Sequence, residues 1–114
     1  MIDRPKFNEN FQYFEKEIIV EIIDIFESEY EDRFKALREN ISIRDFNQLK
    51  FHAHSLKGVI ANFMDPVTIE LSRRLDEKAK NKDEDGLESL FSELEKATGN
   101  LREELQNIRA ELTS

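Results

Sequence analysis

Apolar residues recur along most of the chain at every third or fourth position, the spacing that places them on one face of an α-helix. Four long stretches show this pattern, at residues 16–39, 44–63, 66–81 and from about 85 to near the C-terminus. A shorter stretch, 7–14, carries phenylalanines at similar spacing and predicts a short lead-in helix. Because no segment alternates apolar and polar residues with a period of two, we expect no β-sheet.

Polar residues and prolines mark the expected ends of these helices. Asn40 predicts the end of the first long helix, and Ser42 predicts the N-cap of the next. Asp65 followed by Pro66 is typical of an N-cap and a first helical turn. Four long amphipathic helices with short connections predict an all-α fold, an antiparallel up-down four-helix bundle with a short additional N-terminal helix.

The last stretch has apolar positions that are alternately four and three residues apart, which is a heptad pattern. This heptad seam consists of Leu87, Phe91, Leu94, Thr98, Leu101, Leu105, Ile108 and Leu112. Such a seam fits either a long helix packed within a bundle or a coiled coil that pairs with another copy. Thr98 and Gly99 interrupt it, which favours the bundle.

Composition narrows the class of protein. The 114 residues suit a single domain over 1–114, and a 39% apolar fraction is enough for a core. The chain has no cysteine, no apolar run long enough to cross a bilayer and no N-terminal signal region, so we expect a cytoplasmic protein that does not insert in a membrane. A net charge of −8 disfavours binding to nucleic acid.

His54 lies in the helix predicted at 44–63. On a helical wheel with about 100° per residue, the apolar positions of this helix cluster about 220° away from it. The imidazole is therefore expected in solvent. The candidate binding surface around it consists of Asn47, Lys50, Phe51, Ser55, Gly58 and Ala61. Phe51 is the one large apolar residue of this set, and an aromatic side chain in solvent is unfavourable unless a partner covers it.

An exposed imidazole between cations is suited to carry an anion, and we predict a phosphoryl group. Lys50 and Lys57 lie about one turn to either side of His54, where they repel each other unless an anion is bound. Gly58 costs about 1 kcal/mol relative to alanine inside a helix, and it leaves the backbone open to a partner. A neutral imidazole is a competent nucleophile at neutral pH.

The other candidate chemistry is weaker. His52 lies at the boundary of the apolar face, so we interpret it as a structural residue that makes a local hydrogen bond. Two histidines two residues apart point to different faces and cannot chelate a metal as an i,i+4 pair does, so no metal site is predicted. Lys57 and Gly58 lack the glycine loop of a nucleotide site, and we expect no autonomous kinase activity.

The stretch 54–63, His-Ser-Leu-Lys-Gly-Val-Ile-Ala-Asn-Phe, resembles the signature of histidine phosphotransfer (Hpt) domains. That signature runs His-x-Leu-Lys-Gly-x-[Ser/Ala]-x-x-[Leu/Phe/Val]-Gly, and the resemblance extends over about residues 15–110. It implies a four-helix bundle that exposes a phospho-accepting histidine. That histidine takes a phosphoryl group from an aspartate of one response-regulator receiver domain and passes it to another.

The resemblance also implies roles for single residues. His54 would be the phospho-acceptor, Lys57 would neutralise phosphoryl oxygens, and Gly58 would give close access. Asp76 stands where family members often have a glutamine or an acidic residue that hydrogen-bonds the imidazole. The alternative for Asp76 is a surface acid without a role.

The chain departs from the family pattern at two positions. Ile60 stands where a small residue is usual, and Met64 replaces the glycine that follows the helix. The wheel places Ile60 toward the core, where repacking can accommodate it. Met64 does not supply the family's helix-ending glycine, but Asp65 and Pro66 predict a stop of their own.

The expected partners are receiver domains and a hybrid histidine kinase, with one receiver docking over 47–61. We expect a monomer without a cofactor, because the Mg²⁺ needed for transfer would belong to the receiver. Two alternatives stay open: the phospho-accepting domain of a chemotaxis-type histidine kinase, and a non-catalytic helical adaptor or coiled-coil protein that uses the seam of residues 87–112. The start at Met1 without a kinase domain favours a stand-alone protein, unless the chain is excised from a larger one.

Overall fold

The computed structural model describes residues 1–114 and contains five α-helices and no strand, so the all-α prediction is confirmed. The helices are α1 (Arg4–Asn10), α2 (Lys16–Ser42), α3 (Phe46–Ile60), α4 (Pro66–Lys80) and α5 (Leu87–Thr113). A short 3-10 turn, Ala61–Phe63, follows α3. None of the helices combines the length and the hydropathy that a membrane-spanning segment needs.

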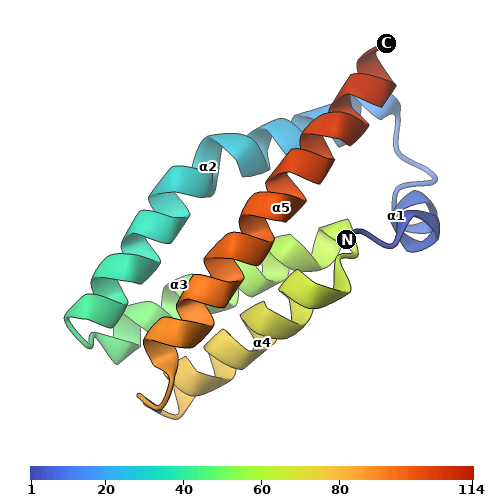
Figure 1. Ribbon diagram of the computed structural model, residues 1–114. Helices are drawn as coiled ribbons and strands as arrows, with labels where there is room; N and C mark the ends of the chain where they lie inside the picture. Colours follow the sequence, from blue (N-terminus) through green and yellow to red (C-terminus); the bar gives the residue numbers. More distant parts are fainter.

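The four long helices pack around a common core. Helix α2 contacts α3 and α5, and α4 contacts the same two helices, while the chain reverses direction at each short connection (Figure 1). Helices α2 and α5 have 27 residues each, whereas α3 and α4 have 15. The α2–α5 pair therefore extends beyond the other two helices, and α1 lies near the end of α3, where it contacts the 3-10 turn (Figure 1).

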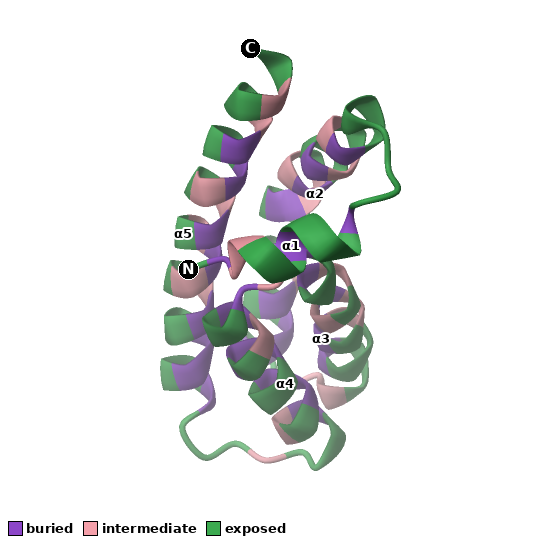
Figure 2. Ribbon diagram, turned by 90° about the vertical axis from the view of Figure 1, so that its right-hand side faces the viewer, coloured by how far each residue is buried: buried purple, intermediate pink, exposed green.

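Buried residues form a strip along the inward side of each long helix (Figure 2). Aromatic pairs join the helices across this core: the ring centroids of Phe26 and Phe63 are 5.2 Å apart, and those of Phe34 and Phe91 are 6.0 Å apart. The heptad seam is buried except for Leu112, which is partly buried. The seam thus packs within the bundle, as the interruptions at its centre favoured.

Those interruptions have local explanations. The buried hydroxyl of Thr98 donates to the carbonyl of Leu94 at 2.6 Å, so its polar group is satisfied inside the seam. A Cβ at Gly99 would lie 3.8 Å from the Tyr30 hydroxyl, which is ordinary van der Waals contact. Neither residue breaks the helix.

The lead-in helix was predicted at 7–14, and this placement is wrong. The helix starts three residues earlier because the side chain of Asp3 accepts a hydrogen bond from the backbone N–H of Lys6 at 3.2 Å. Pro5 fits in the first turn, where no N–H is needed. Phe11 ends the helix as its C-cap.

The predicted stop at Asn40 and N-cap at Ser42 are also wrong. Helix α2 continues through Ser42, and Arg44 reverses the chain with a left-handed φ of 56°. The N-cap of α3 is Asp45, whose side chain accepts from the N–H of Gln48 at 3.1 Å. An aspartate next to the first apolar residue of α3 competes successfully with a serine further away.

The connection between α3 and α4 follows the prediction in part. Helix α3 ends at Ile60, not at residue 63, and Ile60 is fully buried as expected. Met64 has a φ of 59°, the left-handed conformation that suits the glycine of the resembled signature, and a methionine there costs about 1 kcal/mol. Asp65 caps α4 as predicted, because it accepts from the N–H of Val67 at 3.0 Å.

Candidate functional site

His54 projects from the middle of α3 into solvent. Its side chain is 67% exposed, while the opposite face of the same helix, with Leu49, Ala53, Leu56 and Ile60, is buried. The exposure predicted from the helical wheel is therefore confirmed. The imidazole lies on the side of α3 that faces Asp76 of α4.

Asp76 of α4 lies directly behind this imidazole. Its carboxylate is only 2% exposed, and Oδ1 lies 3.6 Å from Nδ1 of His54. Oδ1 accepts no hydrogen bond, although it is buried. Asp76 is therefore not a surface acid. A buried carboxylate oxygen without a hydrogen bond is costly unless a donor is close at hand.

Two lysines neutralise the Asp76 carboxylate. Lys57 Nζ and Lys80 Nζ each lie 3.0 Å from Oδ2. The side chain of Lys57 is 35% exposed and is ion-paired with Asp76, so in the resting protein it is not a free cation beside His54. Lys80 was missed by the sequence analysis, although an acid followed by a lysine four residues later on a helix is a recognisable signal.

The charge of this cluster suits an anionic ligand. Burial alone would raise the pKa of Asp76, but hydrogen bonds from Lys80 and Lys57 outweigh it, and the pKa is lowered. Asp76 is therefore ionised at neutral pH, so one carboxylate faces two ammonium groups. With a neutral imidazole the cluster carries one net positive charge at the place where a phosphoryl group would arrive.

Five more predicted residues lie on the outer face of α3 and at the start of the 3-10 turn that follows it. The residues Asn47, Lys50, Phe51, Gly58 and Ala61 are all exposed. Phe51 is 67% exposed, as expected, and does not tuck under a neighbouring helix. Lys50 forms no ion pair, so it stays available to an incoming anion.

Gly58 is not required by the packing of the bundle. A Cβ at this position would meet no other atom within 4 Å. The fold would thus tolerate a larger residue, which would also raise helix propensity. The open space over Gly58 belongs to the surface beside His54.

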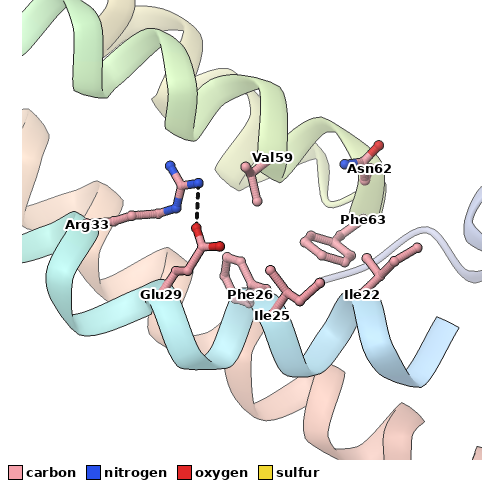
Figure 3. Close-up of a pocket in the computed structure, with 8 residues that line it drawn as sticks. All are labelled: Ile22, Ile25, Phe26, Glu29, Arg33, Val59, Asn62 and Phe63. Atoms are coloured by element: carbon pink, nitrogen blue, oxygen red, sulfur yellow. Dashed lines mark hydrogen bonds and ion pairs between the residues drawn. The ribbon is translucent and has the colours of Figure 1, made fainter. Parts of the chain in front are cut away.

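An apolar pocket of about 240 Å³ lies between α2 and α3, next to this surface (Figure 3). Its floor consists of Ile22, Ile25, Phe26, Val59 and Phe63. At one end Arg33 forms an ion pair with Glu29 at 2.8 Å and donates to Oγ of Ser55 at 2.9 Å. Ser55 thus links α3 to α2. No sequence pattern indicates the role of Arg33 or the pocket, because both depend on how α2 and α3 pack against each other.

Comparison with known families adds to this geometry. The family model of the Hpt domain matches residues 21–111. The chain belongs to the Hpt domain family. Hpt domains serve histidine phosphotransfer in phosphorelays and interact with response-regulator receivers. No curated protein and no solved structure matches the chain significantly.

The second histidine of this Hpt domain has a structural environment. His52 is half-buried, and its Nδ1 donates to Oδ1 of Asn40 at 2.8 Å. The hydrogen bond expected for it is present. In this Hpt domain no three His, Asp or Glu side chains come together in a way that would hold a metal ion.

Proposed function

We propose that this Hpt domain relays a phosphoryl group between the aspartates of receiver domains and carries it on His54. The observation that supports this most strongly is the pairing of an exposed imidazole with a buried, unpartnered carboxylate oxygen at 3.6 Å. His52 lacks both features, because it is half-buried and already bonded to Asn40.

Asp76 would set the tautomer of His54. Its Oδ1 needs a donor, and the ring nitrogen next to it is Nδ1. With the proton on Nδ1, the lone pair of Nε2 faces solvent and is free to attack. In the transfer step a bond forms between Nε2 and phosphorus, the bond from phosphorus to the receiver's aspartate breaks, and its electron pair returns to that carboxylate. The return transfer follows the same path in reverse.

The chain supplies charge and position rather than covalent help. Phosphoryl transfer depends on in-line positioning and on stabilisation of the equatorial oxygens. Lys57 and Lys50 lie about one turn to either side of His54 and supply part of that positive charge. The Mg²⁺ ion would come with the receiver, so we propose no cofactor and no kinase activity for this chain.

The receiver would dock over residues 47–61, on α3 and the first residue of the 3-10 turn. Phe51 offers an exposed aromatic anchor, and Gly58 with Ala61 leaves a flat approach to the imidazole. The apolar pocket beside Ser55 extends this surface toward α2. The heptad seam of α5 is buried in the bundle, which leaves it unavailable for the adaptor alternative while the fold is intact.

A two-receiver chase tests the proposal. The chain is incubated with one receiver domain that carries a labelled aspartyl phosphate, is separated from it, and is then mixed with a second, unlabelled receiver. We expect label to enter the chain and then to leave it for the second receiver. Label that is accepted only from ATP through a kinase would support the kinase-domain alternative, and no uptake at all would support the adaptor.

A further inference from the structure

Two ammonium groups share one oxygen of the Asp76 carboxylate. This is one counter-charge more than the buried carboxylate requires in the unphosphorylated protein. Lys57 Nζ and Lys80 Nζ both lie 3.0 Å from Oδ2, while Oδ1 accepts no hydrogen bond and faces His54. A buried carboxylate requires one counter-charge, because removing its only partner leaves an uncompensated buried ion. The second ammonium is therefore free to leave without stranding Asp76.

The two lysines differ in what else they can reach. Lys57 follows His54 by three residues on α3, so the two side chains are neighbours on one helical face. Lys80 follows Asp76 by four residues on α4, which ties it to the carboxylate. Both lysines are partly exposed, at 35% and 46%, so either can move without losing much burial.

Phosphorylation changes the charges on both sides of the imidazole. When Nε2 of a neutral ring forms the bond to phosphorus, the ring keeps its Nδ1 proton and takes a positive charge, which faces Oδ1 of Asp76. The phosphoryl group brings negative charge to the outer side of His54. A new cation thus appears at the carboxylate, and a new anion appears beside Lys57.

Resting on the function proposed above, we propose that phosphorylation makes Asp76 exchange Lys57 for the His54 ring, while Lys80 stays on Oδ2 as the permanent counter-charge. Lys57 then moves to the phosphoryl oxygens. Lys80 is a positioning residue: it touches neither the phosphoryl group nor the reacting nitrogen, but it releases Lys57 for transfer. Without Lys80, the carboxylate would hold Lys57 as its only ammonium partner.

The test uses phosphoramidate, a small donor that needs no receiver, and follows the Nζ resonances of both lysines by ¹⁵N NMR. On phosphorylation of the full chain, the Lys57 resonance should move and that of Lys80 should stay. In Lys80→Gln the Lys57 resonance should stay at its resting position, and labelling of His54 should be about tenfold slower, the factor expected for losing one charge-assisted contact in the transition state. Lys80→Arg should restore both readouts.

Lys78→Gln is the matched control, because it removes an ammonium from the same helix that pairs with Asp83 at 3.1 Å instead. It should behave as the wild type does. A phosphorylation-induced shift at Lys80 but not at Lys57, or labelling of Lys80→Gln at the wild-type rate, would overturn the exchange. If phosphoramidate labels His54 with the expected shifts but no receiver does, the exchange stands and the proposed relay fails.

Discussion

Oδ1 of Asp76 lies 3.6 Å from Nδ1 of His54, across the contact between α4 and α3, and Oδ1 accepts no hydrogen bond. The contact joins an exposed imidazole to a buried carboxylate. Because Lys57 and Lys80 hold the carboxylate from the other side, its free oxygen is aimed at the imidazole. The orientation of the nucleophile is thus a property of the bundle and not of α3 alone.

Asp76→Asn should slow phosphorylation of His54 by tenfold or more, because a hydrogen bond to a charged group contributes about 1.5–3 kcal/mol. The amide keeps the volume but removes the charge that favours a proton on Nδ1. The rate with phosphoramidate and the ¹⁵N shifts of the ring measure the effect. Asp83→Asn, at an acid that pairs with Lys78 away from the site, is the control. Equal rates for the two variants would remove Asp76 from the mechanism.

The lowered pKa of Asp76 also predicts a pH dependence of stability. The unfolded chain has an ordinary aspartate pKa of about 3.9, so the ionised carboxylate stabilises the fold fully above that value. This contribution is lost as the pH falls below about 4 and through the lower pKa of the folded state. Urea unfolding at a series of pH values should show the wild type and Asp76→Asn converging in acid. A difference that is the same at pH 7 and at pH 3 would contradict the assignment.

Gly58→Ala should separate stability from transfer. The packing leaves room for the methyl group, so the variant should be more stable by about 0.5–1 kcal/mol through helix propensity. Transfer from a receiver should nevertheless slow, because the methyl group stands on the docking surface. Gly99→Ala, which places its Cβ in ordinary contact with Tyr30, is the control for a helical glycine away from His54. Thermal unfolding measures the stability of both variants, and transfer assays measure their rates. An unchanged transfer rate in Gly58→Ala would mean that the receiver does not dock over Gly58.

Phe51→Ala should weaken receiver binding by about tenfold, which corresponds to 1–2 kcal/mol for an aromatic anchor at an interface. Its stability should change little, because the side chain is 67% exposed. Ile43→Ala removes another exposed apolar side chain, at the C-cap of α2, and should leave binding unchanged. Titration calorimetry with a receiver measures both. An equal loss of receiver affinity in the two variants would mean that non-specific hydrophobic contacts, rather than a docking site, bind the receiver.

The sequence predicts those features of the structure that depend on a single helix and not on how helices pack together. The exposure of His54, the burial of Ile60 and the cap at Asp65 all follow from helical period and local hydrogen bonding. The start of a helix is harder to predict where two residues could each serve as the N-cap. Ser42 and Asp45 could both accept hydrogen bonds from free N–H groups in the first turn of α3, and Asp45 is the N-cap in the structure.

Contacts between helices lay beyond the sequence patterns. Asp76 was proposed from family resemblance only, because no spacing rule links it to a histidine 22 residues earlier. The hydrogen bond from Arg33 to Ser55 likewise depends on the register between α2 and α3. Lys80 is the intermediate case, since its i,i+4 spacing to Asp76 was visible but its importance required the burial of the carboxylate.

The most direct test of the central claim is to find which residue carries the label after incubation with a phosphorylated receiver. Acid-labile, base-stable label on His54, located by mass spectrometry, is the predicted result. His54→Gln should take up none, whereas His52→Gln should still be labelled, although losing the hydrogen bond to Asn40 should destabilise it by about 1 kcal/mol. Label that persists in His54→Gln and disappears in His52→Gln would contradict the account.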